Sequence, residues 1–186
     1  MTGKGGKRIL GILILLLILA ALLAGGPYLH RLQAEKRADR ILEQMQVIVP
    51  GLGKDTGISD GTGQDPLPRM VIDDLEITGC LEIPALDLMV PVTAGEEVPG
   101  LAALFRGSPQ KEPFCLTGSP KDVFRKLPKT MPGDRVIFTD LDGVRYTYEV
   151  TTQFHIKEWD EADNDLLLVY ETDPKTYFAV GCKRLP

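Results

Sequence analysis

The chain has 186 residues, of which 44% are hydrophobic and 25% are charged, so it has room for one ordinary domain and some additional segments. Its net charge of −5, with no basic stripe interleaved with aromatic residues, argues against nucleic acid as a partner. The three Cys and two His are scattered singly along the sequence and do not form the paired ligands of a structural zinc site. We therefore expect neither a metal nor a cofactor.

The first element in chain order is an apolar segment near the N-terminus. Residues 9–26 are uncharged and consist mostly of Leu, Ile and Ala, which is about the length needed to cross a hydrocarbon core of roughly 30 Å. A basic tail at 1–8 precedes the segment and no A-x-A cleavage site follows it, so an uncleaved single-pass anchor is favoured over a secretory signal peptide. The basic tail predicts a cytoplasmic N-terminus in the cell membrane, with the rest of the chain outside the cell.

Two connecting segments follow the predicted transmembrane helix. In residues 27–49, apolar side chains such as Leu32, Ile41 and Met45 recur at spacings of three, four or their sums, as one side of a helix requires. This pattern predicts a membrane-proximal helical stalk, with a self-associating coiled coil as the alternative. Residues 50–69 are rich in Gly and Asp and have few side chains able to pack a core, which predicts a flexible linker.

The remaining segment, residues 70–186, has the pattern of an all-β domain. Short β-branched or apolar runs are broken by Pro, Gly and Asp, and Asp142-Gly143 is a strong hairpin signal. The runs predict two strands within 77–92, one strand at 114–118, a hairpin over 134–156, and two closing strands at 165–171 and 176–185. A closed β-barrel of about eight strands with short helical turns fits this series, because closure leaves no unpaired edge.

Three motifs of this domain resemble those of one known family. ITGCLEIPALDLMVPV is similar to an opening strand pair, MPGDRVIFTDLDGVRYTYEV to a K-x-G-D hairpin, and LLLVYETD with YFAVGCKRL to two closing strands. The family is the sortases, membrane-anchored cysteine transpeptidases that join proteins to the cell wall of Gram-positive bacteria. The resemblance spans nearly all of residues 75–186 and implies a sortase-like barrel.

The resemblance also implies where the catalytic residues of the family would lie, and this chain has other residues there. The His position falls on Ser119 and the Arg position falls on Tyr177. The Cys position falls on Glu171, or on Tyr170 if the register slips by one. A Ser cannot act as an acid near neutral pH, and neither Glu nor Tyr supplies a thiolate. We therefore expect a catalytically inactive barrel in which Ser119, Glu171 and Tyr177 bind a peptide together with Trp159.

A displaced active site is the alternative enzyme hypothesis. Cys182 or Cys115 would then be the nucleophile, and His155 and Arg184 would complete a triad with Cys182. Strand alternation places His155 on the solvent side and Cys182 on the same side as Val180, which favours a buried, inert thiol. We expect the thiol of Cys115 to be buried and inert as well.

Two further possibilities stay open at this point. Cys80 could face outward, and a disulfide could join two of the three cysteines, because sequence separation does not show which Cα atoms are close. The acidic segment 159–165 could bind Ca²⁺, although its spacing matches no EF-hand and a solvated loop is favoured.

Three hypotheses about function follow. The leading one is a membrane-anchored, extracytoplasmic sortase-like protein without catalytic activity that binds a sorting-signal peptide, a surface or pilus protein, or an active sortase. The second is a working cysteine transpeptidase or hydrolase with a displaced nucleophile, acting in the anchoring of cell-surface proteins. The third is a structural protein of the cell envelope whose barrel only spaces or bridges its partners.

Overall fold

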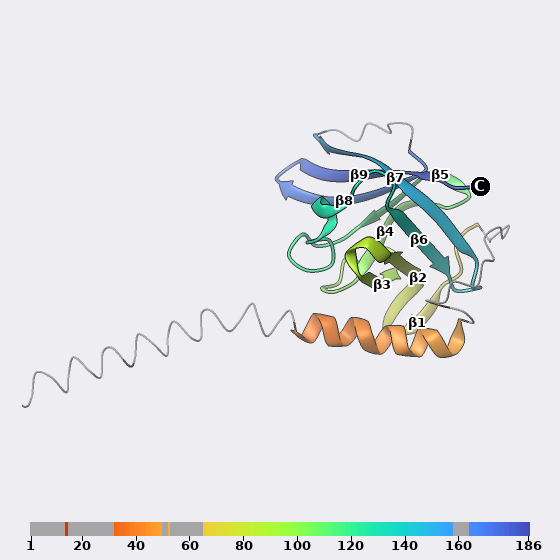
Figure 1. The fold of residues 1–186 in the computed structure, drawn as a ribbon. Helices are drawn as coiled ribbons and strands as arrows, with labels where there is room; N and C mark the ends of the chain where they lie inside the picture. Colours follow the sequence, from red (N-terminus) through yellow and green to blue (C-terminus); the bar gives the residue numbers. More distant parts are fainter. Residues whose placement is uncertain (1–13, 15–31, 50–51, 53–64, 158–163) are drawn as a thin grey trace, which may run out of the picture.

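Strands dominate the computed structural model, which describes residue 14, residues 32–49, residue 52, residues 65–157 and residues 164–186 (Figure 1). In these residues, nine strands belong to one sheet, in the order β1-β2-β3-β4-β5-β8-β9-β7-β6. The strands are β1 (Met70–Ile72), β2 (Leu75–Ile83), β3 (Leu88–Thr93), β4 (Ala102–Ser108), β5 (Lys111–Thr117), β6 (Arg135–Asp140), β7 (Arg145–Ile156), β8 (Leu166–Asp173) and β9 (Thr176–Arg184). Two short 3₁₀ helices, η1 (Pro84–Leu86) and η2 (Leu127–Lys129), lie in the connections.

The sheet closes into a barrel because β6 also pairs with β2, antiparallel, opposite the stretch Gly79 to Glu82. Strands β2 to β9 thus form a ring of eight, and β1 extends the sheet beside the first residues of β2. The pairs β3–β4 and β5–β8 are parallel, whereas the other neighbouring pairs are antiparallel. The structure confirms the predicted all-β closed barrel of about eight strands.

The hairpin predicted at Asp142-Gly143 joins β6 to β7. Gly143 has a φ of 84°, a left-handed conformation that glycine adopts without a steric penalty. The carboxylate of Asp140 accepts backbone N–H groups from Asp142 at 3.0 Å and from Val144 at 2.9 Å. These bonds hold the turn, and the hairpin prediction is confirmed.

The main core fills the barrel with apolar and aromatic side chains. Along β7, Tyr146, Tyr148 and Val150 alternate toward the interior and are fully buried. The rings of Phe114 and Phe138 meet edge to face with centroids 5.0 Å apart. In this part of β7 the buried side chains alternate with half-buried ones, which is the period-2 pattern from which the strand was predicted.

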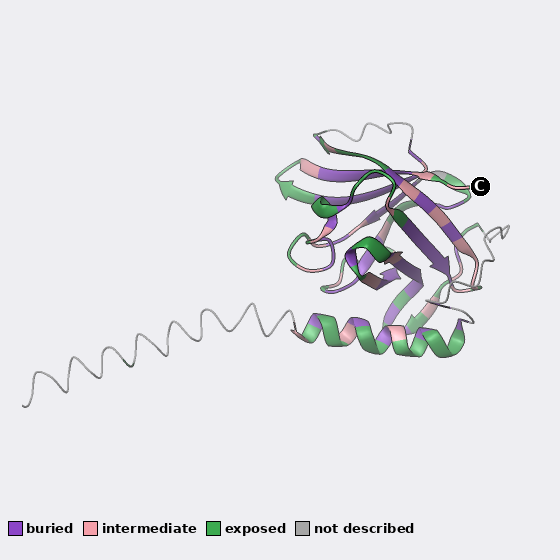
Figure 2. Ribbon diagram, viewed as in Figure 1, coloured by how far each residue is buried: buried purple, intermediate pink, exposed green. Residues whose placement is uncertain are grey.

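The N-terminal helix, residues 32–48, packs against the outside of the barrel beside β1 and β2 (Figure 1). Ile41 and Met45 are fully buried in one apolar cluster with Ile77 and Cys80 of β2. Figure 2 shows buried residues where the helix faces the barrel and exposed residues on its far side. The helix lies within the segment predicted as a stalk, and its apolar face is used against the barrel.

The close approach of helix and barrel depends on a glycine in the β3–β4 connection. A Cβ atom on Gly100 would lie 2.6 Å from the carbonyl oxygen of Ala34, and the φ of Gly100 is 86°. Both the contact and the backbone conformation therefore favour glycine. The division of the chain into stalk, linker and barrel domain stays a prediction, because most of residues 50–69 lie outside the described residues.

Two strands, β1 and β4, were not predicted. In β4, register shifts between Leu104 and Arg106 and again between Arg106 and Ser108 disturb the pairing with β5. Three consecutive residues from Phe105 to Gly107 are exposed, so the period-2 pattern is lost. A strand with such bulges carries little alternation for a sequence analysis to detect.

The predicted transmembrane segment at 9–26 lies outside the described residues, apart from Ile14. In the part of the chain that the structure describes, no helix has both the length and the apolar character needed to span a bilayer.

Candidate functional site

The ends of β5, β8 and β9 bring three of the predicted site residues together. Strands β5 and β8 are parallel neighbours, with Thr117 paired with Val169, so their carboxyl ends meet at one edge. Ser119 lies two residues beyond the end of β5, and Glu171 lies near the end of β8. Tyr177, at the start of β9, pairs with Glu171 in the antiparallel register.

These residues line a pocket of about 550 Å³, called the Glu171 pocket below. Its other walls come from the β3–β4 connection, from β4 and from the turn after β5. The lining residues are Gly95, Glu97, Phe105, Thr117, Gly118, Ser119, Pro120, Lys121, Val169, Glu171 and Tyr177. The structure therefore places in one cavity all three residues that the resemblance assigns to catalytic positions.

The pocket faces outward from the barrel, and alternation along β8 explains its lining. Val169 and Glu171 are two residues apart and share one face of the strand. Tyr170 points to the opposite face, where it is 9% exposed in the main core and its ring lies 5.2 Å from that of Phe178. Glu171, and not Tyr170, is therefore the β8 residue near this end that faces the pocket.

Hydrogen bonds orient the polar groups of the pocket. The Thr117 hydroxyl donates to Oε1 of Glu97, and the backbone N–H of Lys175 donates to Oε1 of Glu171 at 3.1 Å. The Ser119 hydroxyl oxygen accepts the backbone N–H of Lys121 at 3.2 Å. Each carboxylate thus has one oxygen engaged in these bonds while its residue remains exposed to solvent.

All three cysteines of the chain are free and buried. Burial raises the pKa of Cys182 to about 12 and the pKa of Cys115 to about 12. Burial also raises the pKa of Cys80, which lies beneath the N-terminal helix. Because the thiolate is the nucleophilic form, these environments suppress nucleophilic chemistry near neutral pH.

The displaced triad of Cys182, His155 and Arg184 is not brought together. Cys182 faces the main core and pairs with Val150, whereas His155 is exposed, five residues further along β7 and about 15 Å away by strand geometry. The guanidinium of Arg184 lies 5.1 Å from the centre of the Tyr146 ring. The structure confirms that Cys182 faces the interior and that His155 is exposed. The prediction that His155 lies on the face of β7 opposite Val150 is wrong, because a register shift between Val150 and Thr152 reverses the alternation. His155 therefore pairs with Phe178, and the centres of their rings are 5.4 Å apart.

Cys80 shows where simple alternation is insufficient. Ile77 and Cys80 are three residues apart, yet both belong to the cluster beneath the helix. A register shift between Ile77 and Gly79 reverses the alternation and directs Cys80 out of the barrel. The thiol faces outward from the sheet, as the sequence analysis allowed, but the helix covers it.

Two other candidates from the sequence, Trp159 and the acidic segment 159–165, are at most partly described. Trp159 lies outside the described residues, as do the first residues of the acidic segment. The last residue of that segment, Asp165, forms an ion pair with Lys183 at 3.0 Å and accepts the backbone N–H of Arg184 at 2.6 Å. Its carboxylate is therefore already engaged by other groups of the barrel.

Four polar or aromatic side chains of the Glu171 pocket were not predicted: Glu97, Phe105, Thr117 and Lys121. Glu97 and Phe105 belong to β4 and its preceding connection, a region where no strand was predicted. Thr117 lies in the predicted strand at 114–118, and its position two residues before Ser119 was the available signal.

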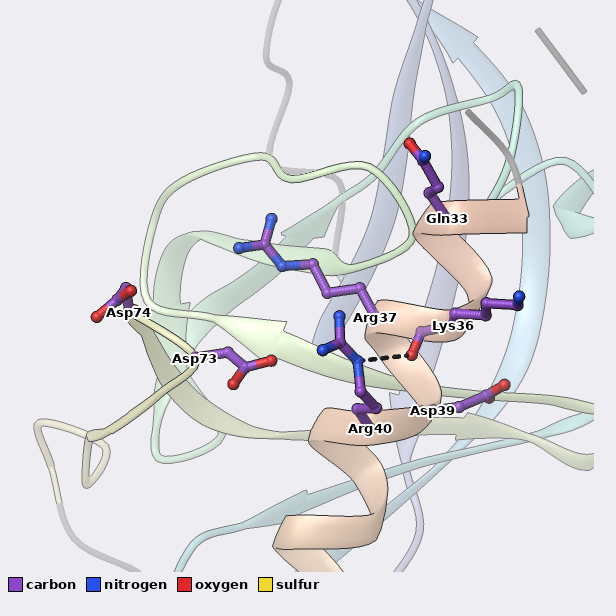
Figure 3. A pocket seen from close by; sticks show the side chains of 7 residues that line it. All are labelled: Gln33, Lys36, Arg37, Asp39, Arg40, Asp73 and Asp74. Atoms are coloured by element: carbon purple, nitrogen blue, oxygen red, sulfur yellow. Dashed lines mark hydrogen bonds between the residues drawn. The ribbon is translucent and has the colours of Figure 1, made fainter. Parts of the chain in front are cut away.

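A second hollow, of about 850 Å³, lies between the N-terminal helix and the β1–β2 turn (Figure 3). Arg37 and Arg40 extend from the helix toward the turn, and the carboxylate of Asp73 points back toward the helix (Figure 3). Its lining residues are Gln33, Lys36, Arg37, Asp39, Arg40, Asp73 and Asp74, whose formal charges cancel. No residue predicted to be functional lines this hollow.

Comparisons with known proteins are consistent with the fold. The sequence matches the family model of the sortase domain over residues 81–182, which is more than half of the chain. A search of curated proteins found no match.

Several solved sortases are among the structures to which this chain is similar. A sortase D5 transpeptidase of Clostridium perfringens is 18% identical with a TM-score of 0.48, covering 59% of this chain and 79% of that chain. Sortase E of Streptomyces avermitilis is 21% identical with a TM-score of 0.48, covering 58% of this chain and 87% of that one. Sortase A of Corynebacterium diphtheriae is 15% identical with a TM-score of 0.49, covering 84% of both chains.

Proposed function

The chain belongs to the sortase family, and on that premise we propose that it binds a peptide segment in the Glu171 pocket without cleaving it. In this proposal it is a membrane-anchored protein whose barrel lies outside the cell. Residues 9–26 anchor it, and the basic tail at 1–8 stays in the cytoplasm. Its partner is a sorting-signal peptide, a surface or pilus protein that carries one, or an active sortase.

One observation carries the proposal: Ser119, Glu171 and Tyr177 line a single cavity at the positions where the family resemblance places His, Cys and Arg. A cavity of this size can hold several side chains of a peptide. Its exposed Phe105 and half-buried Tyr177 provide apolar contact, and the oriented carboxylates and hydroxyl provide hydrogen-bond acceptors. These are properties of a binding site.

The same residues do not supply the chemistry of acyl transfer. That reaction needs an activated nucleophile, an acid for the leaving amine and a donor for the oxyanion. Among the described lining residues there is no thiol and no imidazole, and the Ser119 oxygen accepts a backbone N–H. The residues at these positions therefore cannot carry out the family's catalytic mechanism.

The test uses the full chain in detergent micelles with a fluorescent LPxTG peptide and a nucleophilic amine. We expect fluorescence anisotropy to show that the peptide binds. Mass spectrometry should detect no transpeptidation product and no acyl-thioester. Tyr177→Ala should weaken retention by about tenfold through lost aromatic contact, whereas Met131→Ala, at an exposed site outside the pocket, should not. Turnover that Cys182→Ala abolishes would contradict the proposal.

A second candidate is a transpeptidase or hydrolase that uses Cys115. This residue lies on β5 two positions before Thr117, on the strand face that leads to the pocket, and pairs with Arg106 of β4. This placement favours Cys115 over Cys182 as a displaced nucleophile. If the full chain turns over the peptide, loss of that turnover in Cys115→Ala would identify this function.

A further inference from the structure

We infer that the Glu171 pocket selects a peptide with a basic side chain, Lys or Arg, which Glu97 and Glu171 bind through their carboxylates. The inference rests on the proposed function, because it specifies which peptide the pocket takes. Acyl transfer by the family's mechanism requires no carboxylate at the position of Glu97 or of Glu171. A role in binding explains why both carboxylates line the cavity.

The charges of the pocket support a cationic ligand. Glu97 comes from the β3–β4 connection and Glu171 from β8, so two separate elements supply carboxylates to one cavity. Among the described lining residues, Lys121 is the one cationic side chain, which gives the lining a formal charge of −1. An ammonium or guanidinium group in the cavity would donate charge-assisted hydrogen bonds to these carboxylates.

The hydrogen bonds around these carboxylates prepare them for such a ligand. In both residues the bond reaches Oε1, from the Thr117 hydroxyl for Glu97 and from the Lys175 N–H for Glu171. Each bond limits the rotation of its carboxylate and leaves acceptor positions for a ligand. An arrangement fixed before binding loses less side-chain entropy when the ligand arrives.

The apolar part of the lining fits the stem of a long basic side chain. Phe105 is 53% exposed and Tyr177 is half-buried, and both line the cavity with Val169. Lys and Arg cover apolar surface with their methylene groups while the charged end reaches polar groups, and an aromatic ring attracts the cation. A small inorganic cation would leave this apolar surface uncovered.

The test compares three LPxTG peptides that differ at x, which is Lys, norleucine or Glu. Norleucine keeps most of the stem of Lys and removes its charge. With the full chain in detergent micelles, we expect the Lys peptide to bind about tenfold more tightly than the norleucine peptide, and the Glu peptide most weakly. The advantage of Lys should decrease when the salt concentration is raised, because it is electrostatic.

Variants of Glu97 and Glu171 test whether these two carboxylates cause the preference for the Lys peptide. The double variant Glu97→Gln/Glu171→Gln should bind the Lys and norleucine peptides equally. The control Glu96→Gln/Asp173→Asn makes the same change in net charge at exposed neighbours that do not line the cavity, and should keep the tenfold preference.

The possible negative results distinguish a failure of this inference from a failure of the proposed peptide binding. If all three peptides bind equally, the inference is overturned and the proposed peptide binding stands. If the control variant loses the preference as fully as the double variant, the effect belongs to overall charge and the inference is also overturned. If no peptide binds, the proposed function fails together with the inference.

Discussion

The outside of the barrel has two contrasting regions, the face covered by the N-terminal helix and the Glu171 pocket. On the covered face, Ile41 and Met45 have no solvent exposure and pack against Ile77 and Cys80. In the pocket, Phe105 and Glu171 are exposed, and hydrogen bonds hold the polar groups in place. The difference indicates that the covered face contributes mainly to stability and the pocket mainly to binding, so substitutions in the two regions should have separable effects.

The largest expected effect concerns the thiols: Cys80 lies on the covered face, Cys115 lies on β5 two positions before Thr117 of the pocket, and Cys182 faces the main core. With pKa values of about 12, Cys115 and Cys182 have about a thousandfold less thiolate at pH 8 than a thiol of pKa about 8.5. Alkylation by iodoacetamide in the native state should be slower than that of a model thiol by about this factor. Peptide mapping by mass spectrometry gives the rate at each cysteine, and rapid labelling of Cys115 alone would indicate an open, reactive pocket face.

Truncating the helix side chains should give the largest loss of stability. Met45→Ala or Ile41→Ala removes buried methyl or methylene groups and leaves a cavity, which should lower the free energy of unfolding by about 2–5 kcal/mol. Urea unfolding followed by circular dichroism measures the change. Val47 is 86% exposed on the same helix, so Val47→Ala should change the free energy by about 0.5 kcal/mol or less. Equal effects at Met45 and Val47 would show that the helix does not depend on this packing.

Substitutions of Asp140 test whether a buried, hydrogen-bonded polar group contributes to stability rather than to binding. Asp140→Ala leaves the N–H groups of Asp142 and Val144 without their acceptor and should cost about 1–3 kcal/mol. Both bonds reach the same oxygen, Oδ1, so Asp140→Asn can retain them and should cost less. Urea unfolding of the two variants measures the difference, and equal losses would contradict this role for the turn.

The free energy of unfolding of the Asp140→Asn variant should also depend on pH differently from that of the parent protein. Burial raises the pKa of Asp140, so the folded protein holds this proton more strongly than the unfolded chain does. The stability that the protonated carboxyl contributes is present below the unfolded pKa, about 3.9, and is lost as the pH rises through the folded pKa. Relative to the parent, Asp140→Asn should therefore become more stable as the pH rises above the unfolded pKa of about 3.9, as measured by unfolding at each pH.

The smallest expected effect on stability belongs to the pocket carboxylates. Glu97→Gln and Glu171→Gln change exposed side chains and keep their shape, so each should alter the free energy of unfolding by about 0.5 kcal/mol or less. Thermal unfolding measured alongside peptide binding would show both effects in one preparation. A large loss of stability in either variant would mean that the pocket and the covered face are not separable.

Local patterns in the sequence predicted much of the fold but only part of the site. The Asp142-Gly143 turn, the alternation in β9 and the alternation in β7 up to Val150 each depend on a few consecutive residues, and the structure confirms them. Beyond Val150 a register shift reverses the alternation of β7, which the local pattern did not predict. Strand β4 was missed because its bulges remove alternation, and Glu97 and Phe105 were missed with it. Ser119, Glu171 and Tyr177 were selected through the family resemblance, and no local pattern connects them.

Local sequence is enough to predict the β-rich pattern of residues 70–186, the hairpin turn and the buried side of Cys182, because these follow from dihedral preference and from the two-residue period of a strand. The position of the helix over Cys80 and the shared cavity of Glu97 and Glu171 could not be predicted in this way. Those contacts join segments far apart in the chain, and they depend on strand order and register, which the closure of the barrel sets.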